Sequence, residues 1–445
     1  MFNTMIIRFA VFSTLLGFIC SGPLLAQDTL TVEEALSIGL ENNYSIRIAG
    51  NDSEIAANNY TLGNAGFLPT LTATGSRSYS IQDSKQEFAQ GGIPNNTTEN
   101  AKSNSTNANA SLNWTIFDGL RMFTTYDRLN ELKALGDEQF RLTLENTIAS
   151  IISAYYNIIR QQKIYDVLES TVEVSEQRIS IAETRKDLGS GSEYDLLQAR
   201  ADLNADKAAV IRQEVQLNSA KILLNELLSR EINTEFSVME SIPLDEDLEY
   251  NELLQKAMQN NKQLTVARIN QKVAGLEIRE LQGERYPEVN LNAGYNYSRN
   301  ESGAGFIELN QSDGFNYGVT ARLNIFDGFN TGRQIENAKI RQKNFEMAVE
   351  DQKLQLEAGM SAEFRNYLNS LELVKLESEN LIFAEQSLEI ALERFKLGTI
   401  NSIELREVQR TLISAESRLI QAQFEAKLAE TELQRISGSL TQEEI

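Results

Sequence analysis

Histidine is absent from this chain of 445 residues, which contains one cysteine and five prolines. Histidine is the side chain most often used as a general base and as a zinc ligand, so its absence weighs against hydrolytic and zinc-dependent chemistry. The only thiol, on Cys20, cannot form a disulfide within the chain. We therefore expect a protein that is not an enzyme, with no catalytic residue, no cofactor and no metal.

Long apolar runs are missing after residue 26, where no stretch reaches the roughly 20 apolar residues of a membrane-spanning helix. Any membrane-spanning part must therefore be made of strands. Basic residues are fewer than acidic ones, 41 against 63, so the net charge is −22. This field repels nucleic acid, and no Walker A pattern that would hold a nucleotide occurs. We expect no nucleic-acid partner and no energy source within the chain.

Residues 1–26 have the pattern of an export signal peptide. Arg8 precedes an apolar run from Phe9 to Cys20, and a cleavage site of the small-residue type fits after Ala26. A lipid anchor on Cys20 is not expected, because bulky residues come directly before it. The mature chain is therefore expected outside the cytoplasm and without a thiol.

The chain contains an internal duplication. Four features of the first half recur in the second. The matching residues are 218 positions apart before the predicted strands and 209 positions apart after them. The matched pairs are Asn43 with Asn261, Pro69 with Pro287, Phe117 with Phe326 and Gly189 with Gly398. A duplication of this length predicts two quasi-equivalent structural units. We place the first repeat at residues 27–236 and the second at residues 237–445.

Each repeat contains two segments in which apolar and polar residues alternate. The segments cover ~68–82, ~105–117, ~287–299 and ~314–326. Their polar sides consist mostly of hydroxyls and amides, which is typical of outer-membrane strands with one lipid face and one wet face. The aromatic residues on the apolar sides are expected to lie at the membrane interfaces: Tyr79, Trp114, Tyr295 and Tyr297. The alternative is four amphipathic strands packed on a soluble core.

Four strands per chain are too few to close a barrel, since the smallest bacterial examples have eight. Several chains would have to share one barrel, and three chains would supply twelve strands. Closure would also remove the exposed edges of the sheet. The polar segments between the strands, residues 82–105 and 300–313, are expected to be long outward-facing loops.

Helices are predicted on either side of the strands. A capping box, Thr31 with Glu34, begins a helix toward Asn58, and its counterpart runs from about Leu248 to Glu284. A proline-free stretch of roughly 66 residues from residue 121 to 186 would extend about 100 Å as one helix. Heptad spacing from Leu381 to Leu433 indicates close helix packing, either in a tube wall or in an ordinary coiled-coil hairpin. An acidic segment, residues 230–247, is expected to connect the repeats outside the core.

Both helical hairpins are predicted to turn at a Leu-Gly motif. Gly189 and Gly398 can adopt the left-handed conformation that ends a helix. Ser192 and Asn401 can cap the next helices, with acidic residues three positions later completing capping boxes. This structural role accounts for Asp195 and Glu404, but not for Glu407, which is otherwise a solvated helix residue.

The signal peptide, the duplicated helix-strand-strand-helix unit, the Phe-Asp-Gly after the second strand and the Leu-Gly tips together resemble the TolC family of outer-membrane efflux and secretion channels. The resemblance implies an α+β membrane protein, a homotrimer whose protomers share a twelve-stranded outer-membrane barrel continued by a periplasmic α-helical barrel. It also implies docking on a periplasmic adaptor protein and an inner-membrane transporter of the RND, ABC or MFS type. The docking positions implied at the tips are Leu188, Gly189, Ser190, Leu397, Gly398 and Thr399.

The resemblance further implies that Asp195, Glu404 and Glu407 ring the periplasmic entrance. The tyrosine and arginine that close the entrance in the family correspond here to Phe395 and Ile400, which cannot form the same bonds. Closure must therefore use other contacts. The function expected is a passive outer-membrane duct for efflux or type I secretion; the alternative is a non-channel envelope scaffold or adaptor built on coiled-coil hairpins.

Overall fold

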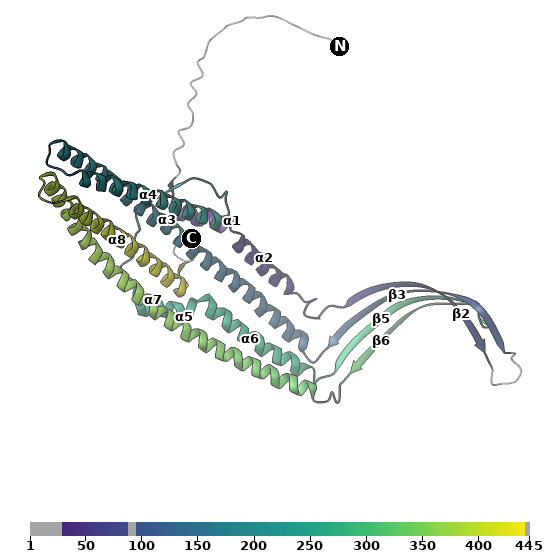
Figure 1. The fold of residues 1–445 in the computed structure, drawn as a ribbon. Coiled ribbons are helices and arrows are strands. Elements are labelled where there is room, and N and C mark those ends of the chain that lie inside the picture. Colours follow the sequence, from purple (N-terminus) through teal and green to yellow (C-terminus); the bar gives the residue numbers. More distant parts are fainter. Residues whose placement is uncertain (1–28, 88–94, 441–445) are drawn as a thin grey trace, which may run out of the picture.

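The computed structural model describes residues 29–87 and 95–440, in which a long body of helices is joined at one end to a bent antiparallel sheet (Figure 1). The predicted signal peptide, residues 1–26, lies outside the described residues. The first half contains β1 (Thr29–Leu30), α1 (Val32–Asn42), α2 (Tyr44–Asn59), β2 (Thr70–Gln86), β3 (Asn96–Phe117), α3 (Arg121–Asp187) and α4 (Glu193–Leu227). The second half contains β4 (Ser237–Val238), α5 (Tyr250–Asn260), α6 (Lys262–Gly283), β5 (Glu288–Ser302), β6 (Leu309–Arg322), α7 (Asn330–Lys396) and α8 (Ser402–Ser437). The two halves repeat one order of elements.

The opening segment of each half is two helices, so the prediction of one continuous helix was wrong at this point. The break falls at Asn43 and at Asn261, where the backbone is extended. Asn43 Oδ1 accepts hydrogen bonds from the first backbone N–H groups of α2, and its Nδ2 donates to the Leu227 carbonyl, 2.7 Å away. Asn261 caps α6 and reaches Ile436 O in the same way. Each asparagine therefore starts a helix and ties it to the end of the hairpin in its own half.

The four long strands form one antiparallel sheet in the order β2-β3-β5-β6. The two halves meet at the β3–β5 ladder, which joins Phe117 with Val289 and Ser103 with Ser302. Because β2 and β6 lie at the two edges, each protomer presents two strands with unpaired backbone groups.

The predicted strand boundaries were wrong at several ends. Strand β3 begins at Asn96, inside the expected loop, because the β2–β3 ladder continues past an irregularity at Gln82 and Ser84. Polar side chains do not prevent this extension, since the ladder is made by the backbone. Strand β5 likewise continues to Ser302. Strand β6 ends at Arg322, short of residue 326, because its partner there, Glu288, is the first residue of β5.

The register confirms the predicted alternation of faces. One rung of the apolar face joins Leu71, Leu112, Ala293 and Tyr317, and the next polar rung joins Thr72, Ser111 and Gly294. Side chains on the polar face bond across strands: Thr72 with Ser111 at 2.9 Å, Asn107 with Ser298 at 2.9 Å, Thr115 with Asn290 at 2.8 Å, and Asn296 with Asn316 at 2.8 Å. The polar face is thus a ladder of neutral hydroxyls and amides, with Glu288 and Arg322 at the end nearest the helices.

The Phe-Asp-Gly motifs make the turn from sheet to long helix. After Phe117, both Gly119 and Leu120 have positive φ, 75° and 68°, and Gly328 and Phe329 repeat this with 69° and 65°. The aspartate before each glycine caps the helix: Asp118 accepts from Met122 N at 2.9 Å, and Asp327 accepts from Thr331 N at 2.7 Å. Burial of Gly119 against Gly283 leaves no space for a Cβ atom, which would lie 2.2 Å from Gly283 O. The turn explains why this motif occurs in both halves.

The helices pack as two hairpins, α3 with α4 and α7 with α8, and α3, α6 and α7 lie side by side along the body (Figure 1). Two equivalent cores lie midway along it, one around Ile151, Ile158 and Leu224, the other around Met360 and Leu433. Alanines of the predicted heptad stripe are buried between α7 and α8, including Ala391, Ala415 and Ala426. No helix in the described ranges is both long and apolar enough to cross a membrane.

The segment between the repeats was predicted to lie outside the core, and this prediction was wrong for part of the segment. Phe236 is buried in the first core cluster, and β4 pairs in parallel with β1 near the start of the described chain. Tyr155 Oη donates to the Leu30 carbonyl, 2.8 Å away, and accepts from Met239 N. One aromatic residue within an acidic segment is enough to fix the segment, because its burial removes apolar surface from water.

Candidate functional site at the helix tips

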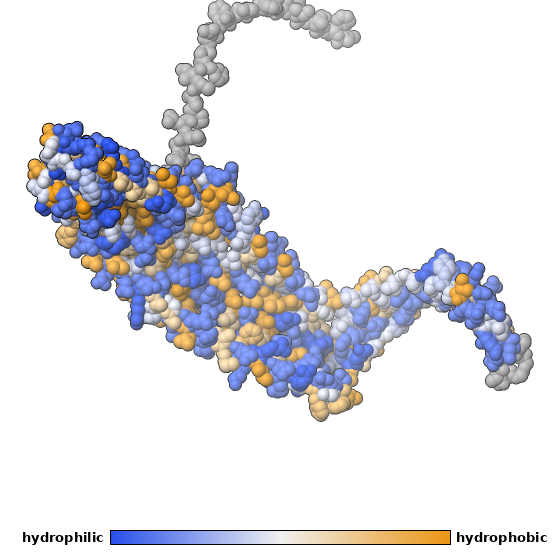
Figure 2. Space-filling model, viewed as in Figure 1, coloured by the Kyte–Doolittle hydropathy of each residue, from blue (hydrophilic) through white to orange (hydrophobic). Residues whose placement is uncertain are grey.

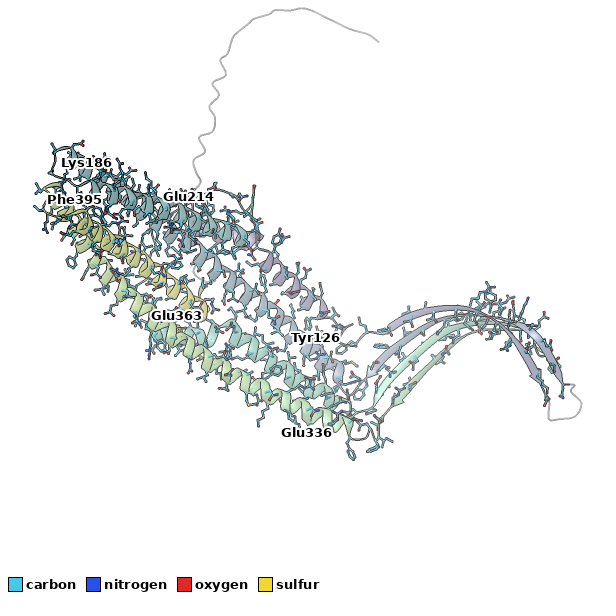
Figure 3. All side chains as sticks on the ribbon, viewed as in Figure 1. Tyr126, Lys186, Glu214, Glu336, Glu363 and Phe395 are labelled. Atoms are coloured by element: carbon cyan, nitrogen blue, oxygen red, sulfur yellow. The ribbon has the colours of Figure 1, made fainter. Side chains whose placement is uncertain are left out.

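Both helical hairpins end at the pole opposite the sheet, near the labelled residues Lys186 and Phe395 (Figure 3). The glycines adopt left-handed φ values there, 73° for Gly189 and 77° for Gly398. Ser190 N donates to Arg185 O and Thr399 N donates to Arg394 O, both at 2.9 Å. Each glycine N–H also donates to the carbonyl three residues before it, at 2.9 Å for Gly189 and 3.0 Å for Gly398. The two hydrogen bonds at each tip form a Schellman motif that satisfies the last carbonyls of α3 and α7. The Leu-Gly motif is therefore a helix stop in both halves.

The predicted capping boxes differ from those found. Asn401 Oδ1 accepts from Ile403 N and Glu404 N, at 3.0 and 2.9 Å, but Glu404 binds the side-chain amide of Asn401 and not its backbone N–H. At the other tip, Ser192 Oγ accepts from Tyr194 N. Asp195 is half-buried, and no hydrogen bond or ion pair of its side chain occurs within the described ranges. Serine lacks the side-chain amide through which Asn401 binds Glu404.

The expected entrance acids are not brought together in one protomer. Glu404 and Glu407 are exposed on successive turns of α8, whereas Asp195 lies in the first turn of α4. Glu407 forms no ion pair with any residue that the structure describes. These side chains are available to solvent, as an entrance residue requires, and their relation to one another depends on how protomers assemble.

The tips carry exposed apolar residues. Leu188 is 77% exposed and Leu397 is 78% exposed. A hollow of about 500 Å³ between the tips is lined by Ile181, Arg185, Leu188, Ser190, Leu397 and Gly398, among others. The Arg185 guanidinium lies 5.4 Å from the Phe395 ring and joins the two hairpins at this level. An exposed leucine beside a hollow is a feature of surfaces that bind another protein.

Phe395 and Ile400 do not take part in polar closure. Phe395 is 1% exposed and Ile400 is 7% exposed, and both belong to a cluster with Leu388, Ala391 and Leu405. They form the apolar core at the tip of the α7–α8 hairpin. The prediction that closing bonds of the family type cannot form at these two positions is consistent with this packing.

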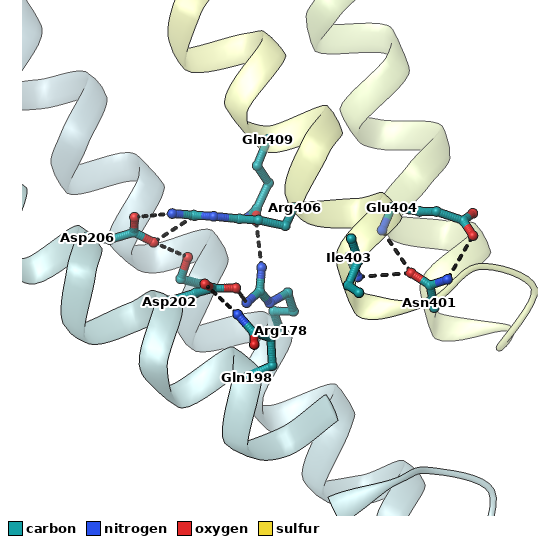
Figure 4. Close-up of polar contacts among 10 residues, drawn as sticks. Arg178, Gln198, Asp202, Asp206, Asn401, Ile403, Glu404, Arg406 and Gln409 are labelled. Atoms are coloured by element: carbon teal, nitrogen blue, oxygen red, sulfur yellow. Dashed lines mark hydrogen bonds and ion pairs between the residues drawn. The ribbon is translucent and has the colours of Figure 1, made fainter. Parts of the chain in front are cut away.

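A polar cluster that sequence reasoning missed connects the two hairpins three turns from the tips (Figure 4). Arg178 of α3 is fully buried; it pairs with Asp202 of α4 and donates to Gln409 of α8, 3.2 Å away. Arg406 of α8 donates to both carboxylate oxygens of Asp206, at 2.9 and 2.6 Å. Ser175 and Gln198 complete the network by donating to Asp206 and Asp202. We call these residues the inter-hairpin cluster.

The inter-hairpin cluster is incompletely satisfied. The Nε atoms of Arg178 and Arg406 and the Nε2 atom of Gln409 are buried without a hydrogen-bond partner among the described residues. A buried ion pair gains little net free energy because both charges lose their hydration, yet removing one partner costs about 3–5 kcal/mol. The cluster therefore mainly fixes the position of α8 against α3 and α4, and it adds little to the free energy of unfolding. The sequence did carry a signal, since Thr171, Ser175 and Arg178 occupy helix-core spacing with polar side chains.

Another buried charge lies midway along the body. Glu145 of α3 is 1% exposed, and its Oε1 is 4.0 Å from Lys262 Nζ of α6. Burial raises the pKa of this carboxyl to about 7, although Lys262 and Arg435 act in the opposite direction. Within the described residues, no group of three or more potential metal ligands is close enough to hold an ion.

Comparisons with known proteins agree on one family. The family model described as "Outer membrane efflux protein" matches residues 35–230 and 253–439. The outer membrane protein TolC of Vibrio cholerae is 22% identical over 314 residues, which cover 70% of this chain and 72% of that protein. The proteases secretion protein PrtF of Dickeya chrysanthemi is 19% identical, covering 93% of this chain and 89% of its own length. The open-state structure of the MtrE outer membrane channel of Neisseria gonorrhoeae superposes with a TM-score of 0.71 at 20% identity, over 92% of this chain and 89% of that one.

Proposed function

Because the chain belongs to the outer membrane efflux protein family, we propose that it is the passive duct of a tripartite export system, docked by its helix tips on a periplasmic adaptor and, through it, on an inner-membrane transporter. The chain is an outer-membrane channel with the TolC-like fold: its helical part lies in the periplasm and its strands contribute to the membrane barrel. The family is one of channels and not of enzymes. The match over both halves favours this function over an envelope scaffold.

A homotrimer is the assembly we propose for this chain. Strands β2 and β6 leave the sheet open at both edges, and pairing β6 of one protomer with β2 of the next would close a sheet of twelve strands. On the helical body, α2 exposes a row of large apolar residues, Tyr44, Ile48 and Ile55, which are 66%, 60% and 57% exposed. Rows of this kind are covered by a neighbouring subunit in oligomers. Each protomer thus lacks a partner along both the sheet and the bundle.

The organisation proposed for the chain keeps the predicted boundaries. Residues 1–26 are the export signal, residues 27–236 the first repeat and residues 237–445 the second. The equivalent asparagine breaks, Schellman tips and Phe-Asp-Gly turns support this division. In the membrane, the aromatics Tyr79, Trp114, Tyr295 and Tyr297 are proposed to contact outer-membrane lipid at the interfaces. Trp114 Nε1 donates to Phe67 O at 2.9 Å, so its indole is already anchored at the periplasmic side of the sheet.

The tips are the proposed docking surface for the adaptor. Leu188 and Leu397 are the exposed apolar contacts, and the flanking residues Gly189, Ser190, Gly398 and Thr399 hold them in position through the Schellman hydrogen bonds. Asp195, Glu404 and Glu407 are proposed to line the periplasmic entrance. Carboxylates that face a narrow aqueous passage concentrate cations there. The transporter is of the RND, ABC or MFS class, and the name of PrtF shows that a related protein serves secretion.

Closure of the entrance is proposed to depend on the inter-hairpin cluster. Arg178, Asp206 and Arg406 are supplied by three helices, so opening the tips by moving α7 and α8 away from α3 and α4 would have to break these contacts. The unpartnered Nε atoms keep the cost of that separation lower than for a fully satisfied network. The cluster supplies the polar contacts that Phe395 and Ile400 cannot.

The observation that carries the proposal is the family match over both repeats, on a fold with two open edges. The test is the native mass of the mature protein extracted from outer membranes in mild detergent, followed by ion selectivity in planar bilayers. We expect a trimer that requires detergent and prefers cations, and we expect Glu404→Gln with Glu407→Gln to reduce that preference without changing the mass. A monomer that needs no detergent would overturn the channel. Unchanged selectivity in the double variant would overturn only the entrance assignment.

A further inference from the structure

The contact between the two repeats inside the chain is a template for a contact between chains. Helices α3 and α6 pack against each other where the first repeat meets the second. By the spacing of the duplication, a residue of α3 corresponds to one of α7 209 positions later, and a residue of α6 to one of α2 218 positions earlier. The counterpart of the α3–α6 contact is therefore a contact of α7 with α2. In one protomer these two helices lie at opposite sides of the helical layer, so this contact can form only between two chains (Figure 1).

The contact of α3 with α6 includes charged residues. Glu131, Glu138 and Glu145 follow one another at intervals of seven positions on α3, and all three are half-buried or buried. Lys272 Nζ of α6 is 3.7 Å from Glu131, and Lys262 Nζ is 4.0 Å from Glu145. The later residue of α3 meets the earlier residue of α6, so the two helices run antiparallel.

The equivalent positions of α7 are apolar and exposed. They are Ile340, Met347 and Leu354, 209 positions after the three glutamates, and they are 59%, 55% and 65% exposed. Figure 2 shows apolar side chains on the surface of the helical body between its tips and the sheet. A row of apolar residues at heptad spacing is typical of a helix that packs against another helix. The α7 row therefore requires a partner outside its own protomer.

Helix α2 supplies a matching row. Tyr44 stands 218 positions before Lys262, and Ile48 and Ile55 follow it after four and seven residues. All three are exposed. The ion pair that Lys262 makes inside the chain is thus replaced, at the equivalent positions, by the apolar pair of Tyr44 with Leu354. Both helices have exchanged charge for apolar surface at the same level.

We propose that α7 of one protomer packs antiparallel on α2 of the next through these two apolar rows. The register of the α3–α6 ion pairs places three pairs within one helical turn of each other. The proposed pairs, with the residue of α7 first, are Leu354 with Tyr44, Met347 with Ile48, and Ile340 with Ile55. The inference rests on the proposed trimer, and it names the surface of the helical body that joins the protomers.

The exchange of charge for apolar surface also fixes the order of repeats around the ring. Burial of apolar area favours α7 on α2. Helix α3 in the same place would put its three glutamates against the apolar row of α2, and carboxylates buried without a partner are costly. The second repeat of one chain therefore selects the first repeat of the next.

The test is cross-linking between introduced cysteines in outer membranes that contain the assembled protein. Cys20, the only native cysteine, lies in the predicted signal peptide, so the introduced thiols are expected to be the only ones in the mature chain. We expect Tyr44→Cys with Leu354→Cys to give covalent dimers and trimers on a denaturing gel after treatment with a short bis-maleimide. The matched control, Tyr44→Cys with Leu368→Cys, moves the second thiol 14 residues along α7 to another exposed position. That shift is about 21 Å, so the control should give at least tenfold fewer cross-linked protomers.

Equal yields from the in-register pair and its control would overturn the interface. Cross-linking of the in-register pair to a protein other than a second copy, identified by mass spectrometry of the gel band, would also overturn it. If Tyr44→Cys prevents assembly, Ile48→Cys with Met347→Cys carries the test, and Ile48→Cys with Leu368→Cys is its control. A trimer by native mass whose in-register pairs cross-link no more than their controls would contradict this inference alone. A detergent-independent monomer would contradict the proposed function as well.

Discussion

At the scale of single residues, Glu145 is the carboxyl whose surroundings differ most from water. Its side chain is 2% exposed, and the nearest cation, Lys262 Nζ, is 4.0 Å away. Arg435 on α8 is held by Glu432 through two hydrogen bonds of 2.7 and 2.6 Å, which leaves it only partly available to Glu145. Glu138, about two turns earlier on α3, adds a repulsive charge. Desolvation therefore dominates over attraction, and the neutral acid is favoured in the folded protein.

Stability should depend on the ionisation of this carboxyl. Because burial raises the pKa of Glu145 to about 7 from 4.5, the folded protein binds its proton more tightly than the unfolded chain does. The contribution is therefore fully present below pH 4.5 and is lost as the pH rises through about 7. The full loss is on the order of 3 kcal/mol, at about 1.4 kcal/mol for each unit of pKa difference. We expect Glu145→Gln to unfold at higher urea than the wild type at pH 8 and to lose less stability between pH 5 and pH 8.

The measurement is the urea midpoint of the helical circular dichroism signal of the trimer in detergent at both pH values. Glu173→Gln, which removes the same charge from an exposed position of α3, is the matched control and should follow the wild type. A Glu145→Gln midpoint with the same dependence on pH as the control would show that the buried carboxyl does not titrate in this range.

At the scale of elements, the relation between the two helical hairpins is the feature that matters for transport. Apolar packing holds α7 against α8, because the heptad stripe is buried within that hairpin. The polar contacts of Arg178, Asp206 and Arg406 are made between hairpins. Near the tips, elements that meet through a polar interface of this kind are suited to moving as units, because the interface is either formed or broken.

Removing one side of that interface should open the tips. Arg406→Gln deletes the bidentate contact with Asp206 and leaves a buried carboxylate that, among the described residues, accepts only from Ser175. We expect a several-fold increase in single-channel conductance in planar bilayers, because the closed arrangement loses about 3–5 kcal/mol relative to the open one. Arg410→Gln, an exposed arginine one turn further along α8, is the control and should conduct like the wild type.

A double variant separates loss of the contact from loss of the fold. Adding Asp206→Asn to Arg406→Gln removes the orphaned charge, so helix content and assembly should be restored while the conductance stays high. Conductance equal to that of the Arg410→Gln control would exclude the inter-hairpin cluster from closure.

At the scale of the whole molecule, the described chain is open at both sides of its sheet and of its helical layer. Its sheet has two free edges, and its helices α2 and α7 lie at the two sides of a layer in which α3 and α6 are the middle members. The first and second halves lie side by side within the chain. The second half of one protomer can pair in the same way with the first half of another. Apolar residues left exposed on α2 are explained only by such a neighbour.

Assembly should therefore be sensitive to charge on α2. Ile55 is 57% exposed, and Ile55→Asp would place an unpaired carboxylate in the proposed interface. We expect this variant to lose the trimer, because a buried charge without a partner costs several kcal/mol at each of three equivalent contacts. Native mass in mild detergent is the measurement. Asn251→Asp, at an exposed position of α5, adds the same charge and should leave the trimer intact; trimers of Ile55→Asp would contradict this interface.

The sequence by itself determined the local elements whose signals are local. The alternation that follows Pro69 and Pro287, the Leu-Gly tips and the repeat spacing were sufficient to predict strands, hairpins and the duplicated fold, because side-chain periodicity and glycine conformation act over a few residues. The helix breaks at Asn43 and Asn261 were missed, although both asparagines had been singled out as equivalent. Each of these asparagines also donates to a carbonyl in another helix, and no local pattern in the sequence shows that partner.

Only the tertiary structure decided which charged residues meet. Arg178 and Gln409 are separated by 231 positions, and Arg406 and Asp206 by 200, so no local pattern joins them. The same holds for Arg77 and Arg299, which share a rung because β5 of the second repeat pairs with β3 of the first. Periodicity assigns a residue to a face, but the order of strands and the crossing of helices assign its neighbours. Those are fixed by packing across the whole chain, and the contacts proposed for closure of the entrance depend on them.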